Sequence, residues 1–222
     1  MTHPRLLTIS LLAAALLGTL AAAVLAATPD RRFAPAGRGV GELGPHASAL
    51  AVSDAGIIYA GSPQEGEIEV FSHGGVSLGR VAAPGLRALA IDGARLLIAD
   101  ASGVREHNGT TLLEATDVTA LAAGGGRVVV ARADGLHDAD GLFAPLDGVI
   151  GVALAPDGSV FAATASERVH RFAADGTALG DFAAPDVRGV AVAPDGSVLL
   201  AQGRIHQIGV FSASGEVLGR HT

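Results

Sequence analysis

The chain has 222 residues and a formal net charge of −7, and it contains no Cys, no Trp and no Lys. This length is sufficient for one domain with its own core. An acidic chain with a few scattered Arg residues lacks the basic surface that nucleic acid requires, so we expect no nucleic-acid partner.

The first 27 residues combine a short basic start, MTHPR, with an uncharged apolar run over residues 6–27. Small residues near Ala26 and Ala27 give the pattern that a signal peptidase cleaves. The run is also long enough to cross a bilayer. The sequence therefore predicts a cleaved signal peptide or a retained N-terminal anchor. Both place the rest of the chain in the periplasm or outside the cell, with membrane contact only through residues 6–27, in the inner membrane, if they are uncleaved.

A five-fold internal repeat follows this segment. Its most similar copies are GVALAPDGSVFAA at 151–163 and GVAVAPDGSVLLA at 189–201, and looser copies begin at residues 49, 88 and 120. Small and larger apolar side chains alternate at the start of each copy, which gives a strand one thin and one bulky apolar face. Such a strand must be covered on both faces, as it is beside the central axis of a ring of sheets.

Turn-forming sequences separate the apolar runs of each copy. PDG at 156–158 and 194–196 is typical of a tight turn between two strands, because Gly accepts a positive φ. A third and fourth strand follow around a further turn, as in QIGVFSASGEVLGR at 207–220. Each copy is therefore predicted to be a four-stranded antiparallel meander of about 31–39 residues, which is typical of a β-propeller blade.

The last copy, VRGVAVAPDGSVLLAQGRIHQIGVFSASGEVLGR at 187–220, resembles an NHL repeat of the kind found in extracytoplasmic bacterial proteins. The matching residues are Pro194, Asp195, Gly196, His206, Ile208, Val210, Phe211 and Gly215, and in the fourth copy Pro156, Asp157, Gly158, Arg168, Val169, Phe172, Asp175 and Gly176. The resemblance covers residues 47–222 and implies an all-β propeller. It implies no particular activity, because one fold hosts many functions.

The predicted organisation is an N-terminal apolar helix followed by a propeller of four-stranded blades. The segments are a signal or anchor over 1–27, a linker or closing strand over 28–46, and a propeller over 47–222 with units near 47–85, 86–117, 118–148, 149–186 and 187–222. Propellers of the NHL type often have six blades, whereas five copies are present. Either the ring has five blades, or residues 31–46 supply part of a sixth. Closure matters because an open ring exposes sheet edges to further pairing.

Candidate binding residues lie in the loops at one end of the predicted ring. The loop entering each first strand and the loop between the second and third strands share this end. They hold Arg87, Asp100, Arg132, Arg188, Arg204 and His206 as binding candidates, together with the acidic residues Glu65, Asp117, Asp147, Glu167 and Asp186. Each of these is either an ordinary solvated loop charge or a member of a converging site. The preferred hypothesis is a non-catalytic binding or scaffold module that holds a protein or small ligand on this rim.

Enzymes on similar propellers define the alternative hypothesis. Gluconolactonase-type lactonases hold a divalent metal through oxygen ligands that include an Asn. The single Asn of this sequence, Asn108, lies in a turn at the opposite end. Streptogramin-type lyases use a His and a Glu near the channel mouth, where His206 and Glu167 form the one nearby pair. We predict no catalysis, no metal site and no cofactor, with a divalent cation expected only under this alternative.

Overall fold

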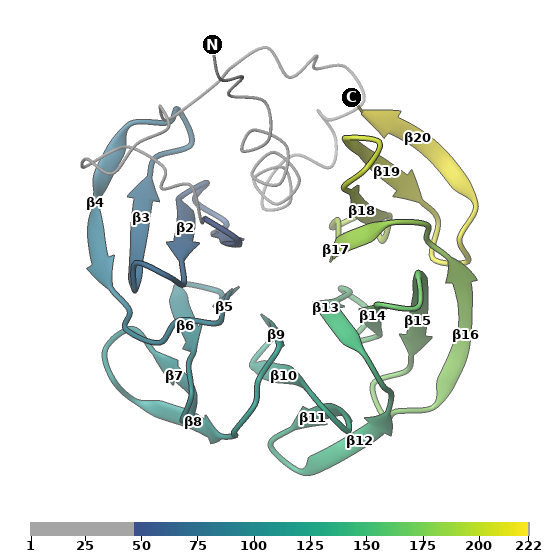
Figure 1. The fold of residues 1–222 in the computed structure, drawn as a ribbon, viewed down its shortest axis with the longest axis horizontal. Helices are drawn as coiled ribbons and strands as arrows, with labels where there is room; N and C mark the ends of the chain where they lie inside the picture. Colours follow the sequence, from purple (N-terminus) through teal and green to yellow (C-terminus); the bar gives the residue numbers. More distant parts are fainter. Residues whose placement is uncertain (1–46, 222) are drawn as a thin grey trace.

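The computed structural model describes residues 47–221, which form five four-stranded antiparallel sheets around a common centre (Figure 1). The predicted all-β propeller of four-stranded antiparallel blades is thus confirmed, with five blades in the described range. The expectations for the signal or anchor segment and for the linker or closing strand concern residues outside this described range. Within residues 47–221, no helix is long and apolar enough to span a membrane.

Each blade consists of four strands that are consecutive in the chain, with the first strand innermost (Figure 1). Blade 1 holds β1 (Ala49–Val52), β2 (Ile58–Ser62), β3 (Glu67–Phe71) and β4 (Ser77–Ala82), and blade 2 holds β5 (Ala88–Asp92), β6 (Arg95–Ala99), β7 (Gly103–Glu106) and β8 (Thr111–Glu114). Blade 3 holds β9 (Ala120–Gly124), β10 (Arg127–Arg132), β11 (Gly135–Asp138) and β12 (Gly141–Pro145). Blade 4 holds β13 (Val149–Leu154), β14 (Val160–Thr164), β15 (Arg168–Phe172) and β16 (Ala178–Ala183), and blade 5 holds β17 (Val187–Val192), β18 (Val198–Gln202), β19 (Gln207–Phe211) and β20 (Val217–His221).

The alternation of small and larger side chains explains why the first strands lie innermost. In β5, Ala88 and Ala90 belong to a core cluster shared with blade 3, where they meet Leu121. The intervening Leu89 and Ile91 belong to the cluster shared with blade 1. The thin side of one blade therefore meets the bulky side of the next, which lets the sheets converge toward the axis.

The core is divided among the interfaces between neighbouring blades. Between blades 4 and 5, for example, Phe161 and Leu200 are 1% and 0% exposed and belong to the same cluster. Full burial of an aliphatic or aromatic side chain stabilises the fold by about 1.5–3 kcal/mol. Because every interface contains several such side chains, the stability of the ring comes from packing of sheet on sheet.

The two PDGS turns have the same geometry. In blade 4, Asp157 Oδ1 accepts hydrogen bonds from the backbone N–H of Ser159 at 2.9 Å and from its hydroxyl at 2.6 Å. In blade 5, Asp195 Oδ1 accepts the same two bonds from Ser197, again at 2.9 and 2.6 Å. These bonds fix the chain between the first and second strands, which explains why this short sequence recurs with so little change.

Within residues 47–221, the ring of blades is open on one side. Neighbouring first strands lie side by side in the order β1, β5, β9, β13 and β17, and no comparable contact joins β17 to β1 (Figure 1). The predicted fourth strand of the last blade is present as β20 and is not replaced by another part of residues 47–221. The described residues therefore form five blades in an incomplete ring.

Candidate ligand-binding site at the channel mouth

Five residues at equivalent positions of the five repeats surround one end of the central channel. Each directly precedes a small residue of the first strand, and they are Ser48, Arg87, Thr119, Ile150 and Arg188. The backbone pairing is equivalent too. The N–H of Arg87 donates to the carbonyl of Ala99 at 2.8 Å, and the N–H of Thr119 donates to that of Ala131 at 2.9 Å. The repeat thus presents one side chain per blade at the channel mouth.

These mouth residues line a cavity of about 390 Å³. Its walls are small or aliphatic: Ala49, Ala88, Ala120, Gly151 and Gly189, then Leu50, Leu89, Leu121, Val152 and Val190, with Leu199, Ala201 and Ile208 from β18 and β19. Ligand sites combine walls of this kind with a few polar groups that fix orientation. The cavity therefore suits the apolar body of a small ligand.

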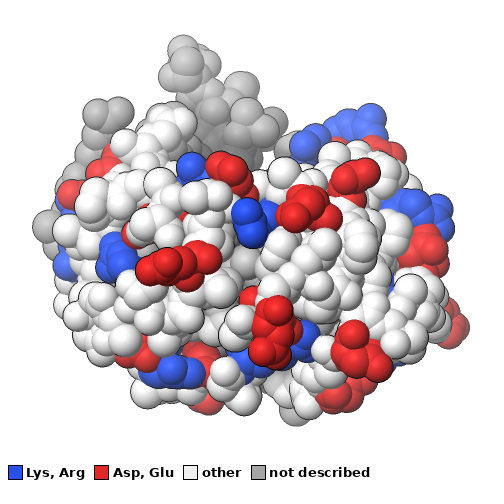
Figure 2. Space-filling view, turned by 90° about the horizontal axis from the view of Figure 1, so that it is seen from below, with Lys and Arg blue, Asp and Glu red and all other residues white. Residues whose placement is uncertain are grey.

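Arg87 and Arg188 are the two charged side chains that line the cavity. Arg87 is exposed and makes no ion pair with any residue of the described range 47–221. Arg188 donates from Nη2 to Oδ1 of Asp186 at 3.0 Å. Elsewhere the charges are mixed: Figure 2 shows acidic and basic side chains interspersed over one side of the ring. Two guanidinium groups therefore lie beside apolar walls at the channel mouth, where each can donate charge-assisted hydrogen bonds to an anionic group.

A network of ion pairs adjoins Arg188. The backbone N–H of Arg204 donates to Oδ2 of Asp186, and Arg204 Nε lies 3.5 Å from Oδ1 of the same carboxylate. The hydrogen bond from the backbone of Arg204, with the charges of Arg188 and Arg204, holds the pKa of Asp186 below its usual value against the opposing effect of burial. Asp186 is therefore ionised at neutral pH and fixes both guanidinium groups.

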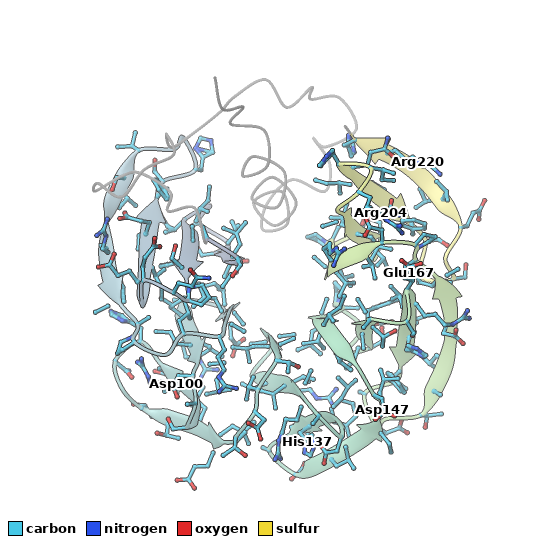
Figure 3. All side chains as sticks on the ribbon, in the orientation of Figure 1. Asp100, His137, Asp147, Glu167, Arg204 and Arg220 are labelled. Carbon is cyan, nitrogen blue, oxygen red and sulfur yellow. The ribbon has the colours of Figure 1, made fainter. Side chains whose placement is uncertain are left out.

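This network extends from blade 5 to blade 4. Arg204 Nη2 lies 3.3 Å from Glu167 Oε1, and both side chains lie at the boundary between the two blades (Figure 3). Both groups are at least half exposed, so the pair itself adds little stability. Arg204 lies beside the cavity and is not part of its lining.

Asp100 and Arg132 form hydrogen bonds with nearby residues of the protein and do not line the cavity. Asp100 Oδ1 accepts hydrogen bonds from the backbone and hydroxyl of Ser102, and its Oδ2 accepts one from Arg105 at 3.0 Å. Burial acts to raise the pKa of Asp100, but these hydrogen bonds outweigh it and the pKa is lowered. Arg132 donates from Nε to the carbonyl of Thr116 at 3.1 Å. Both side chains therefore have structural partners: those of Asp100 lie in its own loop and in β7, and that of Arg132 lies in the loop between β8 and β9.

His206 lies in the loop between β18 and β19 and is also outside the cavity lining. Its φ of 51° is in the left-handed region, as are those of Asp117, Glu167 and Asp186. Gly66, with φ 66°, occupies the place of His206 in blade 1. Because a non-Gly residue in this region is strained, such outliers are candidates for function. Asp186 has the ion-pair network as compensation, whereas the described residues offer the His206 side chain no hydrogen-bond partner.

The proposed acid–base pair of His206 and Glu167 is not joined by any hydrogen bond in the described residues, because Glu167 contacts Arg204 instead. Residues 47–221 also contain no group of three or more His, Asp or Glu side chains placed to hold a metal ion. The alternative enzyme hypothesis therefore keeps its basis in the sequence and gains no geometric support.

Three mouth residues were absent from the predicted site: Ser48, Thr119 and Ile150. Of the six predicted binding residues, the structure brings Arg87 and Arg188 to the cavity. The missed residues are uncharged, and a search for charged loop residues passes over them. The signal that finds them is their shared position, one residue before the small residue that opens each repeat.

Comparison with known proteins supports the fold alone. No family model matches the chain, and no curated protein matches it, so the resemblance to NHL repeats remains a prediction. A solved streptogramin B lyase is 15% identical with a TM-score of 0.57, covering 81% of this chain and 70% of its own. A protein of unknown function from Bacteroides caccae is 14% identical, covering 73% and 71%, with a TM-score of 0.57. The WD40 propeller domain of Doa1 is 16% identical, covering 76% and 64%, with a TM-score of 0.58.

Proposed function

We propose that this chain is a non-catalytic binding module that acts outside the cytoplasm and takes a small ligand, or the end of a larger one, at the channel mouth. The ligand has an apolar body and an anionic group. The observation that supports this proposal is the placement of Arg87 and Arg188 on one cavity whose other walls are apolar. Charge-assisted hydrogen bonds to a carboxylate are the strongest contacts that such a site offers.

The two arginines have different roles in this proposal. Arg188 is already paired with Asp186, so its charge is partly compensated. Arg87 has no such carboxylate in the described range, and it is the principal contact for the anionic group. Thr119 adds little as a donor, because its hydroxyl is directed to the carbonyls of Ala131 and Val149 at 3.2 and 3.3 Å.

Octanoate is a suitable probe because it has one carboxylate and a short apolar chain. Its effect on the melting temperature is compared with those of octanol and octylammonium. Octanol is kept below its solubility limit, and the two ionic compounds are kept below their micellar concentrations. A ligand that binds only the folded state raises the melting temperature by mass action. We expect stabilisation by octanoate and less by the neutral and cationic analogues. Equal stabilisation by all three would reject an anion-selective site.

The location is tested separately, by mass spectrometry of the N-terminus of the protein isolated from a host that exports proteins. A chain that begins near Ala27 or Thr28 indicates a cleaved signal peptide, and an intact residue 6–27 segment in the membrane fraction indicates an anchor. An intact chain in the cytosolic fraction would contradict the proposed location.

A further inference from the structure

Blade 1 has a bulky apolar side that no other described blade covers. Leu50 and Val52 of β1 pack with Ile58 and Ala60 of β2 in a cluster composed only of blade 1 residues. Every other cluster of residues 47–221 is shared by two blades. We call this surface the blade 1 flank. It is the side that would receive the thin side of a preceding blade.

Blade 5 has the matching thin side. On β18, Leu200 faces blade 4 as a member of their shared cluster, so Leu199 and Ala201 face the other way. Ile208 pairs with Ala201 across the β18–β19 ladder and shares that face. We call Leu199, Ala201 and Ile208 the blade 5 flank. Leu199 and Ile208 are 7% and 4% exposed, although neither belongs to a cluster shared with another blade of the described range.

The two flanks also border the ligand cavity. Ala47–Leu50 line it from blade 1, and Leu199, Ala201 and Ile208 line it from blade 5. The opening of the ring therefore coincides with one side of the cavity. An element placed between the flanks would cover the apolar surface of both.

We propose that residues 28–46 of this chain dock in the opening and pack against both flanks. These nineteen residues directly precede Ala47, which already lines the cavity. Fully extended they span roughly 60 Å, enough for two blade-length strands and a turn. A full blade needs four strands, so the segment fills the opening as a partial sixth blade.

The composition of the segment fits both flanks. Phe33, Val40 and Leu43 supply apolar side chains for the flank cores. Arg31, Arg32 and Arg38 outnumber the acidic residues of the segment. Among residues 47–221, the outer part of the blade 1 flank has the opposite balance, because Glu65, Glu67 and Glu69 lie around Arg80. Opposite charges favour this docking over the alternative of a second acidic copy of the chain.

Cross-linking tests this proposal without any ligand, so its outcome is independent of the proposed function. The chain has no Cys, and engineered thiols are therefore the only ones present. In the full chain, Ala201→Cys on the blade 5 flank is combined with Val40→Cys, or in a second variant with Leu43→Cys. The matched controls combine Val40→Cys or Leu43→Cys with Leu179→Cys. Leu179 lies on the outer strand of blade 4 and is 50% exposed. A short bismaleimide joins thiols that lie close together.

The expected product is a cross-linked monomer with Ala201→Cys that forms at least about tenfold faster than with Leu179→Cys, because proximity raises the effective concentration of the second thiol. Three results would overturn the proposal. Covalent dimers from Ala201→Cys alone would place a second copy in the opening. Rapid cross-linking of Ile58→Cys to Ala201→Cys would mean that blades 1 and 5 meet directly. The third result is an equal rate with Ala201→Cys and with the Leu179→Cys control, in both the Val40→Cys and the Leu43→Cys variants.

Discussion

Arg188 donates a 3.0 Å hydrogen bond to Asp186, whereas Arg87, at the equivalent position of blade 2, has no carboxylate partner within residues 47–221. One repeat position thus carries the same side chain in two electrostatic settings. The Asp186 carboxylate offsets part of the positive charge in blade 5. The charge of Arg87 is available to a ligand, which gives the channel mouth an asymmetry that affinity measurements can detect.

Substitution of the two arginines tests this asymmetry. Arg87→Gln removes the uncompensated charge, and a charge-assisted hydrogen bond contributes about 1.5–3 kcal/mol, so octanoate affinity is expected to fall by tenfold or more. Arg188→Gln is expected to have a smaller effect, because Asp186 already shares that guanidinium. Isothermal titration calorimetry measures both. Arg220→Gln on the outer strand β20 is the matched control and should leave the affinity unchanged; a larger loss in Arg188→Gln than in Arg87→Gln would contradict the assignment.

The left-handed loop residues give a prediction about stability. His206→Gly and Asp117→Gly relieve positive φ values of 51° and 60°. Each should raise the free energy of unfolding by about 0.5–1 kcal/mol, because the strain that is relieved exceeds the entropy that Gly adds to the unfolded chain. Ala101→Gly in a neighbouring loop is the control. It lacks a positive φ and should lower the free energy by about 0.5–1 kcal/mol through added chain entropy in the unfolded state. Urea unfolding gives these values.

The octanoate affinity of His206→Gly shows whether His206 has a structural or a ligand-binding role. If His206→Gly stabilises the chain and keeps octanoate affinity, the residue is a tolerated turn residue. A stabilised variant that loses affinity would instead identify His206 as a strained contact of the ligand, since strain retained at a site indicates a role there.

The PDGS turns predict a dependence of stability on acid. Hydrogen bonds from the hydroxyl and backbone N–H of Ser159 lower the pKa of Asp157, and those from Ser197 lower the pKa of Asp195 in the same way. A carboxyl whose pKa is lower in the folded state stabilises the fold fully above its unfolded pKa of about 3.9 and loses that contribution as the pH falls through the folded value. Stability should therefore decline below about pH 4.

Denaturation midpoints at pH 7 and pH 3 measure this effect. The double variant Asp157→Asn with Asp195→Asn should show a smaller loss between the two pH values than the unchanged chain. Asp54→Asn, in the exposed turn of blade 1, is the control because no hydrogen bond to its side chain is present in the described structure. An unchanged acid dependence in the double variant would show that these turns do not contribute.

The metal-assisted enzyme hypothesis predicts that a divalent cation raises the melting temperature, whereas the binding proposal predicts no change. Residues 47–221 hold no group of three suitable ligands, so Ca²⁺ or Zn²⁺ should leave the melting temperature unchanged, and a chelator should have no effect. A rise that is abolished by His206→Ala or Glu167→Gln would restore the lactonase or lyase hypothesis.

The strands and turns of the blades could be predicted because they depend on local sequence patterns. The thin and bulky faces of the first strands and the Asp–Gly turns are properties of a few adjacent residues, and the structure reproduces them in β13 and β17. The opening between β1 and β17 could not be predicted in this way. Closure depends on how far each packed sheet rotates the next around the axis, which is a sum over all interfaces and not a property of one repeat.

The candidate site was only partly predictable for a related reason. Arg87 and Arg188 share a repeat position, and register alone brings them to one end of the channel. Asp100 and Arg132 lie at the same end by topology, but their side chains are held by Ser102, Arg105 and the carbonyl of Thr116. Such hydrogen bonds depend on side-chain geometry within a loop or between neighbouring segments, which the repeat pattern does not specify.

The most direct test of the account is a crystal structure of the chain grown with octanoate. We predict that the carboxylate lies within hydrogen-bonding distance of the Arg87 guanidinium, with the alkyl chain along the Ala and Leu walls of the channel. A carboxylate bound elsewhere, or an alkyl chain that avoids the channel while Arg87 stays solvated, would contradict the account.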